Sequence, residues 1–336
     1  MIRIKFQHKY YYIISLENLL EAWKEFMRGK RARKDVQEFE RNLMANIISL
    51  HRDLEGKTYR HGNYNAFKIN DPKPRDIHKA SVRDRLVHHA VYRILYPYFD
   101  GRFIYDSYSC RLSKGTHRAM NHLRDFSRKV SKNNTRTCWV LKCDIKKFFA
   151  SIDHIILKNI LVKHIEDKNI LWFLSQIIDS FNTEGKTDVG LPLGNLTSQL
   201  FVNIYMNEFD QFVKHRLKAK YYLRYADDFV VLSRNTEYLE KILPAMQEFL
   251  GSKLKLSMHP DKISIQTVAS GVDFLGWVHF PDHRVLRTTT KKRMFRNIKI
   301  KEGKEDVVQS YLGLVSHGNS WKLRQKILKK KSAQSF

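Results

Sequence analysis

The sequence predicts an α+β fold in which a small sheet carries acidic residues and amphipathic helices make up much of the rest. At residues 221–233, two runs rich in aromatic and β-branched residues flank Asp227 and Asp228. This pattern predicts a strand, a tight turn and a second strand. Residues 138–144 form an apolar run that ends in Asp144 and predict a further strand.

The adjacent acids Asp227 and Asp228 are the most informative residues of this pattern. Asp is common in turns, so a solvated hairpin end is the simplest interpretation of such a pair. The apolar flanks instead predict a buried hairpin, where adjacent carboxylates resist ionisation unless a cation neutralises them. A divalent ion such as Mg²⁺ is held by one or two carboxylates plus substrate phosphates. Asp144, at the carboxyl end of its strand, is the candidate for a further ligand.

The charge balance points to a polyanionic partner. The 336 residues include 61 Lys and Arg against 34 Asp and Glu, a net charge of +27. Nucleic acid is the leading candidate, and an anionic membrane surface is the alternative. No stretch approaches the roughly 20 apolar residues of a spanning helix, and residues 8–12 interrupt the N-terminus with polar and aromatic side chains, unlike a signal peptide. A cytoplasmic protein is expected.

The cysteines predict neither a zinc site nor a disulfide framework. Cys110, Cys138 and Cys143 are odd in number and lack Cys-x-x-Cys spacing. Small buried residues are the expectation for all three.

The chain begins with predicted helices. Ser15 caps a helix that runs to about Met27, and a second helix covers residues 35–54, with Asp35 and Glu38 spaced as in a capping box. These helices are either structural, or they bind RNA or a partner protein through their exposed basic residues. Residues 59–69 predict a strand, which Asp71-Pro-Lys-Pro74 ends.

Two blocks, Asp144-Ile-Lys-Lys-Phe-Phe149 and Tyr225-Ala-Asp-Asp228, resemble those of reverse transcriptases, and further blocks agree in order and spacing over residues 56–330. The resemblance implies a right-hand polymerase that extends a primer on RNA. It implies an N-terminal helical extension at 1–55, fingers at 56–137, a palm at 138–280, and a thumb with a basic tail at 281–336.

The resemblance also implies two-metal chemistry. The implied ligands of two Mg²⁺ ions, with Mn²⁺ as the alternative, are Asp144, Ile145, Asp227 and Asp228. Lys262 matches the family lysine proposed to protonate the pyrophosphate leaving group. A surface lysine beside Asp261 is the equal rival interpretation.

A basic segment before a helix, residues 75–89, suits a triphosphate. By resemblance it belongs to the fingers, with Arg75 packing on the base pair and with Lys79 and Arg85 on phosphates. The rival interpretation is that Arg85 pairs with Asp84 or with an acid on a helix.

An aromatic residue follows Asp144 by five positions. In reverse transcriptases the aromatic at this place packs under the sugar and excludes a 2′-hydroxyl, so the resemblance assigns deoxynucleotide selection to Phe149. Phe148 is the alternative, and the spacing favours Phe149. The resemblance also assigns Tyr225 to the nucleotide.

A glycine-containing loop precedes an apolar helix predicted at residues 200–212. The loop residues that the resemblance assigns to the nucleotide are Leu193, Gly194, Ser198 and Gln199. Most relatives have Gln where this chain has Leu193 and Pro where it has Gln199. The pattern is similar to the enzymes of diversity-generating retroelements, which copy a template RNA with errors opposite adenine. This resemblance implies a small basic accessory variability protein as partner.

The remaining blocks imply contacts with template and primer. Their implied residues are Arg111, Lys114, Gly276, Trp277, Lys291, Lys292 and Arg293. Residues 271–280 resemble a primer-grip hairpin, and the basic segment beyond residue 281 predicts a small helical thumb on duplex backbone. The tail from residue 329 is expected to be mobile.

Two rival functions remain. One is a retron-like, intron-derived or antiphage-defence reverse transcriptase. The other is a catalytically silent RNA-binding scaffold, against which the presence of all three acids counts. The expected partners are a template RNA, a DNA or RNA primer and deoxynucleoside triphosphates, without a membrane, in a protein encoded by a bacterium, an archaeon or a phage.

Overall fold

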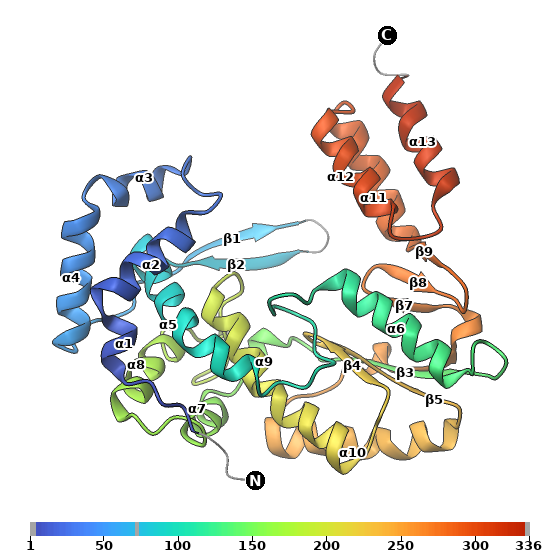
Figure 1. Ribbon diagram of the computed structural model, residues 1–336, viewed down its shortest axis with the longest axis horizontal. Helices are drawn as coiled ribbons and strands as arrows, with labels where there is room; N and C mark the ends of the chain where they lie inside the picture. Colours follow the sequence, from blue (N-terminus) through green and yellow to red (C-terminus); the bar gives the residue numbers. More distant parts are fainter. Residues whose placement is uncertain (1–4, 71–73, 333–336) are drawn as a thin grey trace. The chain divides into compact units, whose positions relative to one another are not determined.

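The computed structural model describes residues 5–70 and 74–332, with side chains described as far as Leu328. The chain forms two compact units (Figure 1). The helical unit comprises Met1–Tyr105, Ile145–Arg216 and Gln247–Ser257, and the sheet unit comprises Asp106–Asp144, Leu217–Met246 and Met258–Phe336. The predicted bounds of fingers, palm and thumb divide the chain differently and stay a prediction.

The helical unit begins with α1 (Tyr10–Ile14), α2 (Leu16–Met27), α3 (Lys34–Arg41) and α4 (Leu43–Glu55). Ser15 caps α2 as predicted, because its side chain accepts a hydrogen bond from the Asn18 amide. The single helix predicted at residues 35–54 is wrong, since the backbone leaves helical geometry at Asn42. Asn favours helix caps over helix interiors. The predicted capping box is also absent, because α3 begins at Lys34 with Arg33 at its N-cap and without a side-chain cap hydrogen bond. The Asp35 carboxylate pairs instead with Lys79 and Arg85.

The rest of the helical unit includes a hairpin, several α-helices and a short π-helix at Phe212–Arg216. Strands β1 (Asn65–Ile69) and β2 (Arg75–Lys79) pair antiparallel, so the strand predicted from residue 59 begins six residues later. The predicted break at residues 71–74 lies mostly outside the described residues. The helices are α5 (Val82–Asp100), α7 (His154–Val162), α8 (Lys168–Ile178) and α9 (Leu196–Gln211), and a short 3₁₀ turn covers Phe149–Ser151.

The sheet unit contains the predicted acidic sheet. Its strands are β3 (Trp139–Asp144), β4 (Tyr222–Tyr225), β5 (Asp228–Ser233) and β6 (Ser264–Thr267), in the order β4-β5-β3-β6. Strand β3 pairs antiparallel with both β5 and β6, which places it inside the sheet. Helix α6 (Thr116–Val130) packs on one face through a shared apolar core that includes Leu123, Val140 and Val230. The predicted hairpin around the two acids is therefore confirmed. Helix α10 (Thr236–Leu254) follows β5.

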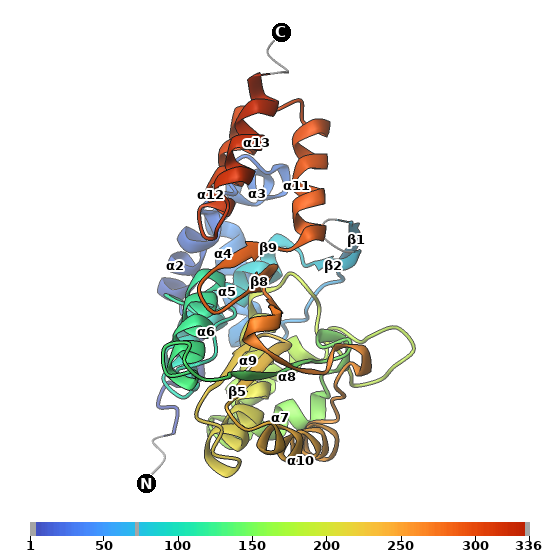
Figure 2. The ribbon, with the colours of Figure 1, turned by 90° about the vertical axis from the view of Figure 1, so that its right-hand side faces the viewer.

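A second, smaller sheet carries the C-terminal helices. Strands β7 (Val272–Phe274), β8 (Trp277–His279) and β9 (Arg284–Leu286) form it, so the hairpin predicted at residues 271–280 is present. Helices α11 (Thr288–Ile300), α12 (Glu305–Val315) and α13 (Trp321–Ser332) follow and lie side by side (Figures 1 and 2). They share an apolar core with the Trp277 indole, which is 1% exposed. Residues 329–332 of the predicted tail belong to α13, and residues 333–336 lie outside the described part.

The prediction that all three cysteines are buried has a mixed outcome. Cys138 and Cys143 are buried and unpaired as predicted, whereas Cys110 is exposed at a turn with φ of 54°.

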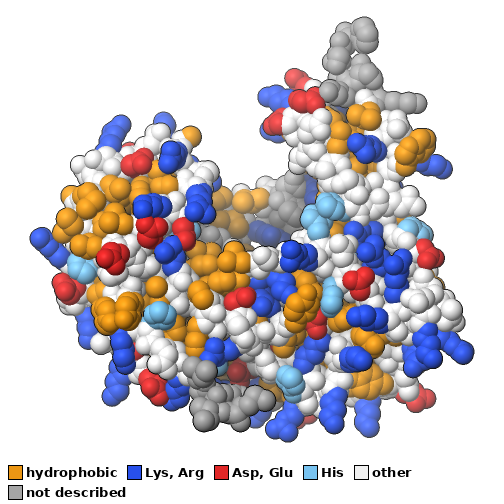
Figure 3. All heavy atoms as spheres, in the orientation of Figure 1, with side chains coloured by type: hydrophobic (Ala, Val, Ile, Leu, Met, Phe, Trp, Pro, Cys, Tyr) orange, Lys and Arg blue, Asp and Glu red, His pale blue; other side chains and the backbone are white. Residues whose placement is uncertain are grey.

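Within residues 5–70 and 74–332, no helix is long and apolar enough to span a bilayer. On the face drawn in Figure 3, hydrophobic side chains gather over the N-terminal helices. Tyr11, Leu16 and Met44 are exposed hydrophobic residues of these helices.

Two glycines of the C-terminal region, Gly313 in α12 and Gly318 in the loop after it, give a matched stability test. A Cβ at Gly318 would collide with the Trp277 ring and lie 2.8 Å from the Arg284 carbonyl oxygen, whereas a Cβ at Gly313 in α12 meets nothing within 4 Å. Gly318→Ala should lower the free energy of unfolding by about 1–3 kcal/mol through overpacking.

Gly313→Ala is the control and should raise the free energy of unfolding by about 0.5–1 kcal/mol. Denaturant unfolding of both variants measures the difference. Equal effects of the two substitutions would show that the packing of Trp277 against Gly318 is not close.

Candidate active site

Three carboxylates gather at one end of the β3–β5 strand pair. Asp144 at the end of β3 and Asp228 at the start of β5 are direct cross-strand partners, so their side chains leave the same face of the sheet. In such pairs the Cβ atoms are roughly 4.5–5.5 Å apart. Asp227 occupies the turn beside them, next to Ala226, whose φ is 54°. The two acids predicted at the hairpin and the acid predicted on the neighbouring strand are thus brought together.

The electrostatics of this cluster call for a cation. Burial raises the pKa of Asp228 to about 6, and the charges of Asp144 and Asp227 raise it as well, against the opposing effect of Lys142. Asp228 Oδ1 is buried and makes no hydrogen bond among the described residues, with Lys142 Nζ 3.6 Å away. A carboxylate cluster whose ionisation is resisted by burial and like charge suits a divalent ion. The residues present therefore fit the predicted Mg²⁺ site, and Ile145, the remaining predicted ligand, is buried next to Asp144.

Lys262 contacts the cluster directly. Its Nζ lies 2.6 Å from Asp144 Oδ1, and the His259 amide donates to the Asp144 carbonyl oxygen at 2.8 Å. The interpretation of Lys262 as a surface lysine beside Asp261 is therefore not what the structure shows. The Lys262 side chain is thus held at the carboxylate of Asp144, and its role as a proton donor stays a prediction.

Two basic residues near the carboxylates were not singled out from the sequence. Arg224 is fully buried on β4, and its Nη1 donates to the Ala226 carbonyl oxygen at 3.0 Å, which braces the turn. Lys142 lies two positions before Asp144 in β3 and approaches Asp228. Because side chains two apart in a strand share a face, the alternation of the strand was the signal for Lys142. A charged residue inside an apolar strand was the signal for Arg224.

In the helical unit, Lys79 and Arg85 share one acid. Lys79 Nζ and Arg85 Nη2 lie 2.7 and 2.5 Å from Asp35 Oδ2, and their hydrogen bonds lower the pKa of Asp35 although burial opposes this. The ion pair with a helix acid that the rival interpretation expects for Arg85 is thus present, with Asp35 of α3, and the assignment of Arg85 to a phosphate stays a prediction. The rival interpretation is wrong as to Asp84, which accepts hydrogen bonds from Tyr59 and Ser81.

The loop before α9 lies against β2. The His78 amide donates to the Leu193 carbonyl oxygen at 3.1 Å, and Asn195 Nδ2 donates to the His78 carbonyl oxygen at 3.1 Å. Gly194 has φ of 105°, a backbone conformation that other residues rarely adopt, and a Cβ there would lie only 3.1 Å from Ile77 Cγ2. Glycine therefore fits both the backbone conformation and the small space at this position. The loop predicted to contact a nucleotide and the basic strand that begins at the exposed Arg75 are therefore neighbours within this unit.

The remaining predicted nucleotide contacts differ in exposure. Phe148 is 4% exposed, whereas Phe149 is half-buried and its carbonyl oxygen accepts a hydrogen bond from Leu191. Phe149 is thus the more exposed of the two, and its role in deoxynucleotide selection stays a prediction. Ser198 is buried at the start of α9, followed by the half-buried Gln199.

The predicted residues for template and primer are spread over the sheet unit. Arg111 Nη1 donates to both the carbonyl and hydroxyl oxygens of Ser107, and Lys114 Nζ lies 4.9 Å from the centre of the Tyr108 ring. Two further predicted residues are neighbours in the chain: Gly276 has φ of 86°, and the Trp277 indole is buried. A primer contact at Trp277 would have to use the backbone.

Tyr225 and the basic part of α11 complete the predicted set. The Tyr225 hydroxyl accepts a hydrogen bond from Thr116 at 3.1 Å. Lys291 and Lys292 are exposed, and Arg293 is half-buried.

A family model described as reverse transcriptase (RNA-dependent DNA polymerase) matches residues 68–279, well over half of the chain. Protein YkfC of Escherichia coli (strain K12) is 27% identical over 259 residues, covering 65% of this chain and 65% of that protein. Group II intron-encoded protein LtrA of Lactococcus lactis subsp. cremoris is 26% identical over 297 residues, covering 67% of this chain and 47% of that protein. The chain therefore spans less than two-thirds of the length of these relatives.

Among solved structures, telomerase from Candida albicans in complex with a fragment of telomeric RNA matches with a TM-score of 0.52 and 11% identity. The match covers 76% of this chain and 54% of that one. At this identity the likeness shows the fold alone, and it supports the predicted α+β right-hand polymerase fold. With the family model covering the hairpin acids and Asp144, the chain belongs to the reverse transcriptase (RNA-dependent DNA polymerase) family.

Proposed function

We propose that this protein is an RNA-directed DNA polymerase that makes cDNA on a template RNA from deoxynucleoside triphosphates. The observation that carries the proposal is the cross-strand pair of Asp144 and Asp228 with Asp227 beside it, in a chain of the reverse transcriptase family. The net charge of +27 suits a nucleic-acid template and primer.

The chain's part in the chemistry is positioning and electrostatics. Asp144, Asp227 and Asp228 would hold two Mg²⁺ ions, which supply activation of the primer 3′-hydroxyl and neutralisation of charge when bound. Strand pairing fixes Asp144 and Asp228 before substrate arrives. Lys262, 2.6 Å from Asp144, is assigned to protonate the departing pyrophosphate.

In the helical unit we assign Arg75, Lys79 and Arg85 to the incoming triphosphate and Phe149 to the exclusion of a 2′-hydroxyl. The half-buried state of Phe149 supports its role over that of the buried Phe148. In the sheet unit, Lys291 and Lys292 on the exposed face of α11 are assigned to duplex backbone.

A more specific proposal is that the polymerase copies RNA with errors as part of a diversity-generating retroelement. It rests on Leu193, whose apolar side chain offers no hydrogen bond, within a loop held against β2. An accessory variability protein and a cytoplasmic location belong to this proposal. An intron-type or retron-like reverse transcriptase is the second candidate, because one relative is named as a group II intron-encoded protein.

Primer extension on an RNA template with Mg²⁺ tests the activity. Asp227→Asn should lower the extension rate by about 10³-fold or more, because several kcal/mol of transition-state stabilisation depend on the metal ligands. Glu240→Gln, an exposed acid on α10, is the control and should leave the rate unchanged. Absence of extension by the unaltered protein, with its own RNA supplied, would instead favour a silent RNA-binding scaffold.

The role of Lys262 is tested by two substitutions. Lys262→Met should slow single-turnover extension by about 10²–10⁴-fold, the usual contribution of a general acid. Lys262→Arg keeps a cation beside Asp144 but does not release a proton near neutral pH, so it should be about as slow. Full activity of Lys262→Arg would show that the side chain only positions Asp144.

Sequencing of the cDNA tests the role of Leu193. Leu193→Gln introduces a hydrogen-bonding group, and one net hydrogen bond of about 0.5–1.5 kcal/mol corresponds to roughly 2- to 10-fold in discrimination. Errors opposite adenine should fall by that factor, while errors opposite the other bases stay constant. Accurate copying by the unaltered protein would move the assignment to the intron-type or retron-like candidate.

A further inference from the structure

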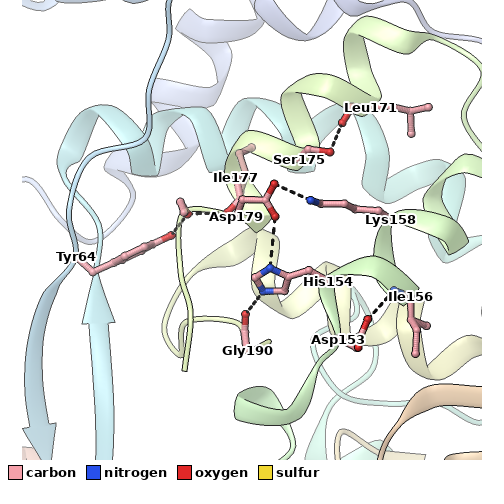
Figure 4. Close-up of polar contacts among 11 residues, drawn as sticks. Tyr64, Asp153, His154, Ile156, Lys158, Leu171, Ser175, Ile177, Asp179 and Gly190 are labelled. Atoms are coloured by element: carbon pink, nitrogen blue, oxygen red, sulfur yellow. Dashed lines mark hydrogen bonds and ion pairs between the residues drawn. The ribbon is translucent and has the colours of Figure 1, made fainter. Parts of the chain in front are cut away.

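A second group of ligand-forming side chains lies in the helical unit, apart from the polymerase acids. His154 is the first residue of α7, Asp179 follows the last residue of α8, and Asp188 lies in the loop before α9. Each offers one ligand atom, and these atoms all lie within 4.8 Å of one another. Figure 4 shows His154 and Asp179 pointing toward each other from the two helices.

The orientation of the His154 ring is set by its other nitrogen. Nε2 lies 2.7 Å from the Gly190 carbonyl oxygen, which only accepts hydrogen bonds, so Nε2 carries a hydrogen. In the neutral ring, Nδ1 is then a bare lone pair. The side chain is fully buried, and Nδ1 makes no hydrogen bond among the described residues.

The buried lone pair faces a carboxylate. Asp179 Oδ1 lies 3.4 Å from Nδ1, a contact that counts as an ion pair only when the ring is protonated. With a neutral ring, two acceptors face each other, and a bound cation removes the repulsion. Asp179 also caps the carboxyl end of α8, where the helix dipole favours positive charge.

We propose that His154 Nδ1 and the carboxylates of Asp179 and Asp188 bind a divalent cation of the zinc class. One imidazole nitrogen and two carboxylate oxygens are a ligand set that Zn²⁺ accepts, with a remaining position for water. The hydrogen bond from Nε2 to a backbone carbonyl is the arrangement that commonly orients a metal-binding histidine. The cation would join the start of α7, the end of α8 and the loop that leads into Gly190.

A neighbouring lysine competes with the cation. Lys158 Nζ lies 2.6 Å from Asp179 Oδ2, so the carboxylate already has a positively charged partner on its other oxygen. Removal of this charge should strengthen cation binding. The chain therefore offers substitutions that move the affinity in both directions.

Zn²⁺ titration of the full chain by calorimetry tests the proposal. The reference protein carries Asp227→Asn and Asp228→Asn, so that the polymerase acids do not contribute binding, and it should bind one Zn²⁺ at this site. Asp188→Asn should weaken that binding by about tenfold or more. Asn tolerates the positive φ of 56° at this exposed position, so the fold is preserved.

Three further variants complete the design. Glu184→Gln, an exposed acid of the same loop outside the cluster, should leave the affinity unchanged. Lys158→Gln should raise the affinity, and His154→Gln should abolish binding at the site. Absence of Zn²⁺ binding in the reference protein, or binding that survives both Asp188→Asn and His154→Gln, would overturn the proposal in favour of a protonated His154 paired with Asp179.

Discussion

The structure of the sheet unit depends on two like-charged side chains placed directly opposite each other. Asp144 and Asp228 are cross-strand partners, and like charges in that position destabilise a strand pair. The surroundings offset this repulsion at each carboxylate. Lys262 contacts Asp144, Lys142 approaches Asp228, and the buried Arg224 holds the turn through the Ala226 carbonyl. The sheet is thereby built around an acidic cluster that it does not neutralise fully.

The acidic cluster could be predicted from local sequence because strand signals are local. Alternating and β-branched residues predict the β4–β5 hairpin, and an apolar run that ends in an acid predicts β3. The order β4-β5-β3-β6 could not be predicted in this way. It depends on pairing between segments far apart in the chain, which local patterns do not report.

Two features that local sequence did not predict have the same physical origin. The sequence offered Asp35 as a helix cap, but the structure engages it with Lys79 and Arg85 from segments 44 and 50 residues away. Likewise, Trp277 sits in a segment that resembles a primer grip, yet its ring fills the core beneath α11–α13. The helix break at Asn42 carried only a weak propensity signal. For Asp35 and Trp277, a tertiary contact overrides the local pattern.

The ion pairs of Asp35 also limit which anions can bind to Lys79 on β2 and Arg85 on α5. Lys79 and Arg85 already share one carboxylate, so an incoming anion must replace contacts that satisfy both cations. A singly charged anion gains little from that exchange, since it offers no more than the carboxylate it displaces. A polyphosphate offers several oxygens and charges at once and can take both cations together. Chloride or free carboxylate ions would therefore not displace Asp35 from Lys79 and Arg85. Only a ligand of high charge density would do so.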